Sequence, residues 1–490
     1  MKMHLPLILR PRLTWRYIAG ALVASYLTYC FLFASPVFSS RLPAYRGEYG
    51  VGAIDIESPI EKRVVRDARF KQGGQPAFQV ETVLFTIYYP TVKGALSSKP
   101  AHRWVPRPLG IVGSGYARFV RISNFVTDSI FTFGLWLAVG STQIPAQVDV
   151  ALHGTPLQVQ RTDPMALSSS DAFPVMVFSH GYASSRTQYT QYLGQIASRG
   201  YVVVAVEHRD GSGPGSVIMK KGVEDVDRLT FSSSHLINGS NLDSDWFKQA
   251  QLDFRQVEIE ETIKVLRHIN EGRGDLVFAD NPRQEGKDLK HWQGRLAVNN
   301  ATIGGHSFGA TLALHLLKNG PSHDLPFQGV VALDPGKSSG RLNDDIQVPA
   351  LIIHSNSWSR RHSLFFGRPH FDVVKDLVRG VLDRATDAWF LTSLGTSHPS
   401  VTDAPVLAPF LLSWTTGSTI DARQGVNQYV ETTGSFLFYQ QSGQKTGLLA
   451  ECITHPDYDV PRPGHQLPGY LRKYWQIHVS PCKSADFIRR

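Results

Sequence analysis

The sequence predicts an α/β fold, in which a mostly parallel sheet carries helices on both faces and a hydrophobic helix precedes it. Short apolar runs alternate with helical runs from about residue 80 to 400, which is the pattern of strand–helix–strand units. The 490 residues are 42% hydrophobic and 19% charged, as expected for a well-filled core. Helices are expected over 187–198, 247–270 and 310–318. No repeat or linker divides this stretch, so we expect one large domain.

The N-terminal region contains an uncharged apolar run over residues 17–35, which ends at Pro36. Basic residues are more frequent before the run than after it, with Lys2, Arg10, Arg12 and Arg16 against Arg41 and Arg46. A run of this length just crosses a bilayer core, and the charge bias favours a cytosolic N-terminus. We therefore expect a basic head over 1–16, an uncleaved signal anchor or transmembrane helix over 17–35, and a linker over 36–44. In that case the protein is a single-pass membrane protein whose main domain is lumenal or extracellular.

The alternative for residues 17–35 is a signal peptide. Small residues around 37–39 offer a usable cleavage site. Cleavage there would yield a secreted protein. Both interpretations direct the chain into the secretory pathway.

Residues 305–309 read G-H-S-F-G and fit the pattern G-x-S-x-G. The apolar run 301–304 precedes them, and a helical segment without Pro or Gly follows. A strand that turns sharply into a helix holds Ser307 on a strained elbow, with its hydroxyl exposed. The flanking glycines are needed because side chains there would collide with the neighbouring strand and helix. The pattern predicts that Ser307 is a nucleophile.

A nucleophilic serine needs an orienting acid, which follows it in the chain in this arrangement. Asp334 comes directly after the apolar run 329–333, whereas the next run, 350–353, has no carboxylate at its end. An acid at the C-terminal end of a buried strand points into the same crevice as the elbow. Asp372 and Asp376 lie on an expected helix over 371–382, where a solvated acid is the simpler reading. We therefore predict Asp334 as the acid.

The general base is expected among the histidines that follow the acid, His354, His362, His370 and His398. His398 follows the strand-like run 389–394 and a short loop, from which an imidazole reaches back to the serine. His362 and His370 lie in an Arg-rich polar stretch, and His354 suits a strand end. His306, inside the elbow, is expected to pack beneath it. We predict His398 as the base.

Two backbone N–H groups are expected to form the oxyanion hole. Phe308, the residue after the nucleophile, supplies one of them. The other comes from a loop after an earlier strand, and the run 174–179 is followed by His180, Gly181 and Tyr182. The Tyr182 amide is the natural second donor.

These segments carry a family resemblance. Residues 178–181 (FSHG), 198–210 (SRGYVVVAVEHRD), 305–309 (GHSFG) and 331–334 (VALD) resemble the platelet-activating factor acetylhydrolases, which are calcium-independent lipases of the group VII phospholipase A2 type. Weaker similarities occur at 49–55, 88–90 and 104–106. The resemblance covers about residues 45–440 and implies an α/β-hydrolase fold over that range, with a C-terminal extension over 441–490. It also implies a nucleophile at Ser307, an acid at Asp334 and a base at His398, with Tyr182 in place of the usual Leu.

The activity that the resemblance implies is serine carboxylic-ester hydrolysis. The expected substrate is the short or oxidised sn-2 acyl ester of a glycerophospholipid, as in a 1-alkyl-2-acetylglycerophosphocholine esterase, and no cofactor, calcium or other metal is expected. The same triad also suits an esterase, lipase or acyltransferase acting on another lipid or metabolite ester. A non-catalytic binding module is a third possibility, although such proteins usually lose a triad member. Residues 211–250 and 271–294 depart from the family pattern.

The three cysteines and the sequons agree with a secretory route. Cys30 lies in the apolar run, whereas Cys452 and Cys482 flank the tail and either form a disulfide or remain two thiols. Asn238 begins a sequon in a Ser-rich loop and is a candidate for N-glycosylation. The sequon at Asn300 runs into the nucleophile strand, so we expect it to be less accessible.

The expected partners are a lipid ester and a membrane, not nucleic acid. The net charge is +9, but no basic stripe with interleaved aromatic residues is present. A mildly basic surface favours anionic membranes. Residues 116–137 are apolar and rich in aromatic residues, which suits either an interfacial helix or a buried helix pair. Histidines and cysteines show no metal-ligand spacing.

Overall fold

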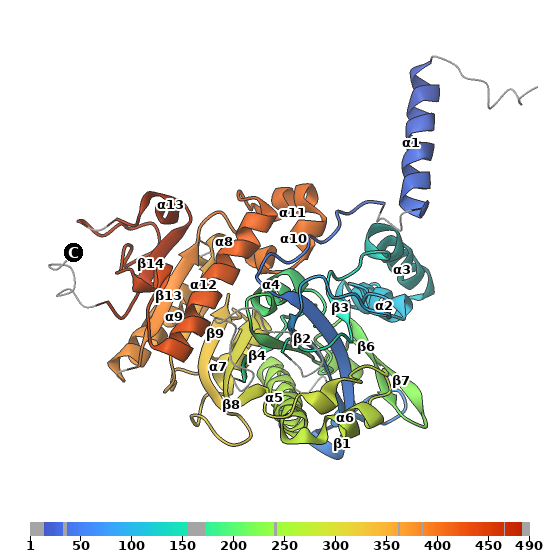
Figure 1. Ribbon diagram of the computed structural model, residues 1–490, viewed down its shortest axis with the longest axis horizontal. Coiled ribbons are helices and arrows are strands. Elements are labelled where there is room, and N and C mark those ends of the chain that lie inside the picture. The colour runs from blue at the N-terminus through green and yellow to red at the C-terminus, as the bar shows by residue number, and fades with distance from the viewer. Residues whose placement is uncertain are drawn as a thin grey trace, which may run out of the picture.

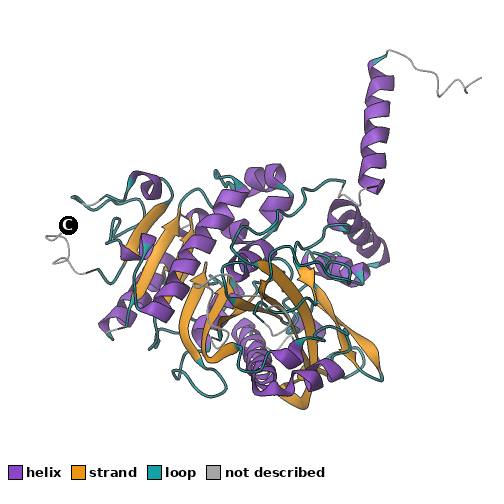
Figure 2. Ribbon diagram, viewed as in Figure 1, coloured by secondary structure: helices purple, strands orange, loops and turns teal. Residues whose placement is uncertain are grey.

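The computed structural model describes residues 14–32, 37–154, 172–239, 243–360, 363–384, 386–464 and 466–482. Its centre is a ten-stranded sheet within those residues, seen in orange in Figure 2. The strand order across it is β14 (Trp475–Val479), β13 (Ala388–Ser393), β10 (Ala350–Ser355), β9 (Phe327–Leu333), β8 (Leu296–His306), β4 (Phe173–Ser179), β5 (Val202–Glu207), β2 (Pro76–Thr91), β1 (Gly50–Arg69) and β3 (Gln147–Val148).

The middle of the sheet is parallel, and antiparallel pairs flank it on both sides, with the short edge strand β3 parallel to β1. Strands β13, β10, β9, β8, β4 and β5 run parallel to one another. Strand β2 lies antiparallel to both β5 and β1, and β14 lies antiparallel to β13. The parallel strands are apolar nearly throughout because helices bury both of their faces. The predicted α/β class with a mostly parallel sheet is confirmed.

Two layers of helices cover the sheet (Figure 1). Buried residues of α5 (Ser244–His268), α7 (Phe308–His315) and α9 (His370–Asp383) form one hydrophobic cluster, which includes Val177 and Val204. Residues of α2 (Leu109–Phe119), α4 (Thr190–Ala197) and α12 (Ala422–Ser442) form the other, which includes Met176 and Val203. Adjacent residues of one strand thus belong to opposite clusters, because side chains alternate across a sheet.

The three helices predicted from the sequence are present with shifted ends. Helix α4 starts at Thr190 rather than 187, and α7 covers 308–315 rather than 310–318. Helix α5 starts at Ser244 because the Asp243 side chain caps it by accepting a hydrogen bond from the Trp246 N–H. The shorter helical elements are α6 (Gly274–Asp280), α8 (Asn356–Arg360), α10 (Ala404–Leu407), α11 (Pro409–Thr416), α13 (Gly469–Arg472), η3 (Ser233–His235), η5 (Ile269–Arg273), η6 (Leu289–His291), η7 (His398–Val401) and η8 (Gly447–Ala450).

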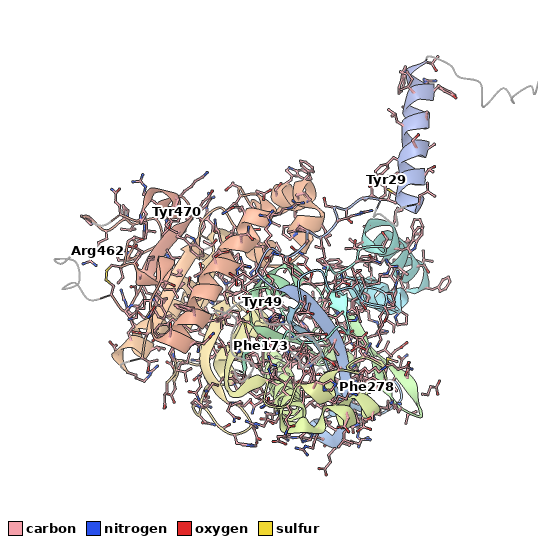
Figure 3. All side chains as sticks on the ribbon, viewed as in Figure 1. Tyr29, Tyr49, Phe173, Phe278, Arg462 and Tyr470 are labelled. Atoms are coloured by element: carbon pink, nitrogen blue, oxygen red, sulfur yellow. A yellow bond between two sulfur atoms is a disulfide. The ribbon has the colours of Figure 1, made fainter. Side chains whose placement is uncertain are left out.

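The N-terminal helix α1 (Trp15–Leu32) projects from the body of the molecule, as Figure 3 shows at Tyr29. Within the described residues, no helix has the length and apolar character needed to span a bilayer. The prediction of a transmembrane helix over 17–35 is therefore not supported. Residues 1–13 of the expected head over 1–16, and residues 33–36, lie outside the described part.

The apolar segment 116–137 combines features of both structures predicted for it. It forms a helix pair, α2 and α3 (Phe125–Val139), in which α2 buries one face against the core. Helix α3 has no buried residue and exposes several apolar side chains. Two small hairpin sheets complete the fold, β6 (Gly215–Lys220) with β7 (Val223–Leu229), and β11 (Leu364–Phe365) with β12 (Arg368–Pro369).

The described part of the C-terminal segment 441–490, which ends at residue 482, joins the central sheet. Its strand β14 is buried along its whole length and adds the edge strand beside β13. A disulfide joins Cys452 to Cys482, on either side of β14. The resemblance to the family ends at about residue 440, which is why the sequence placed a boundary there. Strand β14 nevertheless joins the sheet, because its alternate apolar residues cover the end of the core.

Candidate active site

Ser307 occupies the sharp turn between β8 and α7. Its backbone has φ 55° and ψ −118°, a conformation that side chains other than glycine rarely adopt. A side chain at position 305 would lie 2.1 Å from the Gly309 carbonyl oxygen, and one at 309 would lie 2.0 Å from the Ser179 carbonyl oxygen. Glycine is required at both positions because the backbones approach so closely. The turn has the strand–serine–helix geometry of the nucleophile elbow in α/β-hydrolases.

His398 reaches the serine from the first residue of η7, which follows β13. Its Nε2 lies 3.1 Å from Ser307 Oγ, and its Nδ1 lies 2.9 Å from Asp334 Oδ2. The imidazole is 30% exposed, whereas Asp334 is buried. Three residues from the ends of three different elements are thus brought into one hydrogen-bonded chain, in the order that the sequence predicts.

Asp334 follows β9 and is held by the end of the neighbouring strand. The Ser355 N–H donates to its Oδ1 at 2.6 Å, and the Ser355 hydroxyl donates to Oδ2 at 2.7 Å. These bonds orient the carboxylate toward His398. The other acids considered lie away from this chain on α9, where Asp372 is 3.6 Å from Lys375 and Asp376 pairs with Arg368.

The side chain packed on the His398 imidazole is Trp358, on α8. The two rings are stacked, with centroids 4.0 Å apart and planes 11° apart. The indole also contacts the Lys337 ammonium, 4.5 Å from its centroid, and the Pro335 carbonyl, which accepts from Nε1 at 3.0 Å. Sequence reasoning missed Trp358, because it lies 40 residues before His398 and no local pattern links the two.

His306 packs beside the triad, as expected. Its ring centroid is 4.5 Å from that of His398, and its Nδ1 lies 2.9 Å from the Tyr189 hydroxyl. Burial, with His398 nearby, holds the pKa of His306 well below its usual range. The ring is therefore neutral, and the Tyr189 hydroxyl donates to it while accepting from the Gly181 N–H at 3.0 Å.

The loop after β4 lies directly against the elbow. A side chain at position 181 would lie 3.1 Å from Ser307 Cβ. The amides on either side of Tyr182 are both engaged, since the Gly181 N–H donates to Tyr189 and the Ala183 N–H donates to the Ser212 carbonyl at 2.8 Å. No described residue accepts from the Tyr182 N–H itself. Phe308 opens α7, so its N–H also has no intrahelical acceptor.

Backbone N–H groups that lack an acceptor at a helix N-terminus suit an anion. The Tyr182 and Phe308 amides are therefore the candidate donors of the oxyanion hole. The exposed Tyr182 side chain contacts Phe119 at the end of α2, with ring centroids 5.2 Å apart. The helix pair α2 and α3 therefore borders the entrance to the site.

A second chain of serine, histidine and carboxyl lies in the protein interior, behind the oxyanion loop. Ser179 Oγ is 2.8 Å from His208 Nε2, and His208 Nδ1 is 2.7 Å from Glu258 Oε2. Burial raises the pKa of Glu258 well above its usual range and lowers that of His208. All three residues are inaccessible to a substrate, so we assign them to the support of the loop.

Potential metal ligands converge in the described residues at His306, Asp334 and His398, whose donor atoms lie within 4.8 Å of one another. Both nitrogens of His398 are already hydrogen-bonded to Asp334 and Ser307. The arrangement therefore fits a proton relay without further ligands.

The remaining sequence-predicted residues lie outside the triad. His354 and His370 are buried with their rings 5.4 Å apart, and His362 is outside the described residues. Asn238 is exposed in a turn. Asn300 is also exposed, on β8, so the expectation of lower accessibility was wrong: Asn300 lies where β8 shifts its register against β4, between Ala297 and Thr302, before the strand pairs again up to the elbow.

Comparisons with known proteins agree with this geometry. The family described as platelet-activating factor acetylhydrolase, isoform II, matches residues 36–447. A platelet-activating factor acetylhydrolase of Gallus gallus is 23% identical over 333 residues, covering 65% of this chain and 66% of its own. One of Bos taurus is 29% identical over 309 residues, covering 61% and 56%. The matched region thus spans 56 to 66% of the length of these relatives.

Among solved structures, a ferulic acid esterase from Streptomyces cinnamoneus matches with a TM-score of 0.48 at 15% identity. The alignment covers 85% of this chain and 97% of that one. The sheet order and the strand–serine–helix turn assign the fold independently of this likeness.

Proposed function

This chain belongs to the platelet-activating factor acetylhydrolase family, and from that membership we propose that it is a serine esterase of glycerophospholipids. Its proposed reaction is calcium-independent hydrolysis of a short or oxidised sn-2 acyl ester. The single observation that carries the chemistry is the position of His398, which bridges Ser307 at 3.1 Å and Asp334 at 2.9 Å.

The first half of the reaction is acyl transfer to Ser307. The Ser307 hydroxyl attacks the ester carbonyl while His398 Nε2 takes its proton. Asp334 accepts from the Nδ1–H, which fixes the tautomer and stabilises the imidazolium. His398 then returns the proton to the departing glycerol oxygen, leaving an acyl-enzyme and a lysophospholipid.

The second half is deacylation. A water molecule gives a proton to His398 and attacks the acyl carbonyl, and the carboxylic acid leaves as Ser307 recovers its proton. In both tetrahedral intermediates the negative oxygen accepts from the Tyr182 and Phe308 amides. Preorganised donors of this kind stabilise the developing charge, so that no metal has to polarise the carbonyl.

The substrate is proposed to arrive from a lipid surface. Helix α3 exposes Phe125, Phe133 and Trp136, and α11 exposes Phe410 and Trp414, which are 90% and 85% accessible. Helix α11 follows shortly after His398 in the chain. Helix α3 packs on α2, and the end of α2 contacts Tyr182. Figure 1 places α3 and α11 on the side of the molecule from which α1 projects. Exposed aromatic side chains on this side suit shallow insertion into a membrane interface.

We also propose that the protein is secreted or lumenal. The Cys452–Cys482 disulfide supports an oxidising compartment. The exposed turn at Asn238 supports glycosylation of its sequon. Expression in a eukaryotic secretory host should give a shift on endoglycosidase treatment that Asn238→Gln abolishes. A cytosolic, unglycosylated product would contradict this placement without affecting the triad.

The decisive experiment for the enzymatic proposal combines labelling and turnover. A fluorophosphonate probe should label the wild-type protein and not Ser307→Ala. Unlabelled wild-type enzyme should then be compared on phospholipids with sn-2 acetyl, oxidised and long acyl chains, and on triacylglycerol. Preference for the acetyl and oxidised phospholipids supports the proposal, whereas activity confined to neutral lipids or water-soluble esters contradicts the substrate class.

A further inference from the structure

We infer that Arg255 is a positioning residue for the oxyanion hole, and that it holds the two segments that supply its amides in register. This inference rests on the proposed function, because it concerns the same reaction. Arg255 lies on α5 and never reaches the substrate: its side chain is completely buried. Its guanidinium contacts both halves of the hole from behind.

The first contact is with the loop that carries Tyr182. Arg255 Nη1 donates to the His180 carbonyl at 2.8 Å and to the Ser179 hydroxyl at 3.3 Å. The His180 carbonyl belongs to the peptide unit that leads into Gly181, one residue before Tyr182. Two charge-assisted bonds therefore restrain the backbone just before the amide that must point at the oxyanion.

The second contact is with Ser212, in the segment after β5 that borders the Tyr182 loop. Arg255 Nη2 donates to the Ser212 hydroxyl, and the Ser212 carbonyl accepts from the Ala183 N–H at 2.8 Å. Residues on both sides of Tyr182 are thus restrained by Arg255. His180 is bonded to it directly, and Ala183 is linked to it through Ser212.

The third contact is with the elbow. The guanidinium carbon lies 4.4 Å from the centroid of the Phe308 ring, within the range of a cation–π interaction. Phe308 carries the other oxyanion amide. The Arg255 side chain therefore contacts both Phe308 and the loop that carries Tyr182.

Asp210 keeps this guanidinium in place. It accepts from Arg255 Nε at 2.8 Å, and both side chains have no accessible surface. Asp210 also accepts from the Ser212 N–H at 3.1 Å. A buried ion pair is often no more stabilising than apolar residues of the same volume. The contacts of Arg255 with both segments indicate that this ion pair orients the backbone of the oxyanion hole.

The test separates orientation from stability. Arg255→Met removes the guanidinium and leaves the Asp210 carboxylate buried without its partner, so this variant is expected to be destabilised. The double variant Arg255→Met/Asp210→Leu removes both charges, and its urea midpoint should recover toward that of the wild type. Its kcat on p-nitrophenyl acetate should nevertheless stay about 10²-fold low, since loss of one oxyanion donor or a 1 Å misplacement costs about that much. KM should change less than about threefold, because the hole acts in the transition state.

Inhibition by a trifluoromethyl ketone is a second measurement, and a purely structural role of Arg255 would not change it. The ketone forms a tetrahedral adduct with Ser307 whose oxyanion occupies the hole, so its inhibition constant should rise by the same factor as kcat falls. The matched control is Arg209→Met, which breaks another buried pair, with Glu57 at 2.7 Å. Arg209→Met should lower the urea midpoint while keeping wild-type kcat and inhibition.

Each outcome decides one of the two proposals. The positioning role would be overturned if the double variant, once its urea midpoint has recovered, showed wild-type kcat and inhibition. An equal loss of kcat in Arg209→Met would overturn it as well. If the wild-type enzyme cleaves p-nitrophenyl acetate but no phospholipid, the proposed substrate fails, and the comparison of variants still tests Arg255.

Discussion

The imidazole of His398 lies flat against the indole of Trp358, with centroids 4.0 Å apart and an angle of 11° between the planes. The His306 ring also lies near this imidazole, with centroids 4.5 Å apart and an angle of 38° between the planes. Two aromatic rings therefore contact the His398 imidazole while its nitrogens bond to Ser307 and Asp334. Such packing restricts the ring to the plane in which both hydrogen bonds form.

Removing the indole should loosen the base without removing it. Aromatic pairs of this kind contribute about 0.5–1.5 kcal/mol, so Trp358→Ala should lower kcat by about two- to twelvefold. Trp358→Phe, which keeps a ring in place, should lose less. Steady-state kinetics on a water-soluble ester measures both. A loss in Trp358→Phe as large as that in Trp358→Ala would argue against stacking as the cause.

Ser307→Ala and His398→Ala should each lower turnover by several orders of magnitude while the protein remains folded. The two residues act as a unit, so the double variant should be little worse than either single variant, about 10⁶-fold below wild type in comparable enzymes. Circular dichroism and the urea midpoint check folding, and single-turnover kinetics checks activity. Near-normal hydrolysis by a folded Ser307→Ala protein would refute the mechanism.

Asp334→Asn should keep the fold and lower kcat by about 10⁴-fold, because an amide favours the wrong tautomer of the imidazole. Asp376→Asn, on the surface of α9, is the matched control and should have wild-type kcat. The acid assignment is wrong if the control variant is the one that loses activity.

Chelation should leave the activity unchanged, because the two amides are proposed to stabilise the oxyanion. The measurement is hydrolysis of a phospholipid ester after dialysis against EDTA, with and without added calcium. Loss of activity that calcium restores would contradict the proposal, and would direct attention to the donors of His306, Asp334 and His398, which lie within 4.8 Å of one another.

Stability should fall as the pH falls below about 6.5, the pKa of an unperturbed histidine. Burial lowers the pKa of His370 to about 3, so between these values the unfolded chain binds a proton that the folded chain does not. This one residue should therefore remove about 1.4 kcal/mol per pH unit from the free energy of unfolding over that window, with its contribution fully present above pH 6.5. His370→Phe should flatten the dependence measured by urea unfolding at pH 7, 6 and 5.

The control for that measurement is His323→Phe, at an exposed position. Its slope against pH should match that of the wild type. An unchanged slope in His370→Phe would mean that other buried histidines dominate, and would refute the assignment to His370.

The sequence alone determined the fold class, the family and the chain order of the proposed triad. These are local properties: an all-apolar run such as 202–206 encodes a strand buried on both faces, and G-x-S-x-G between a strand and a helix encodes an elbow. Each triad residue could be predicted separately, because each follows its own strand. Their meeting was implied by parallel strands, whose C-terminal ends lie on one edge of the sheet.

Only the tertiary structure decided which side chains surround these residues. Trp358 stacks on His398 and Arg255 supports the Tyr182 loop across large separations in sequence, and no periodicity encodes such contacts. The same holds for β14, whose place beside β13 was missed because edge pairing depends on which strand is left uncovered when the sheet assembles. Helix α3 was ambiguous for the related reason that an apolar helix looks alike in sequence whether protein or lipid covers it, and only the packing of α2 beneath it leaves α3 exposed.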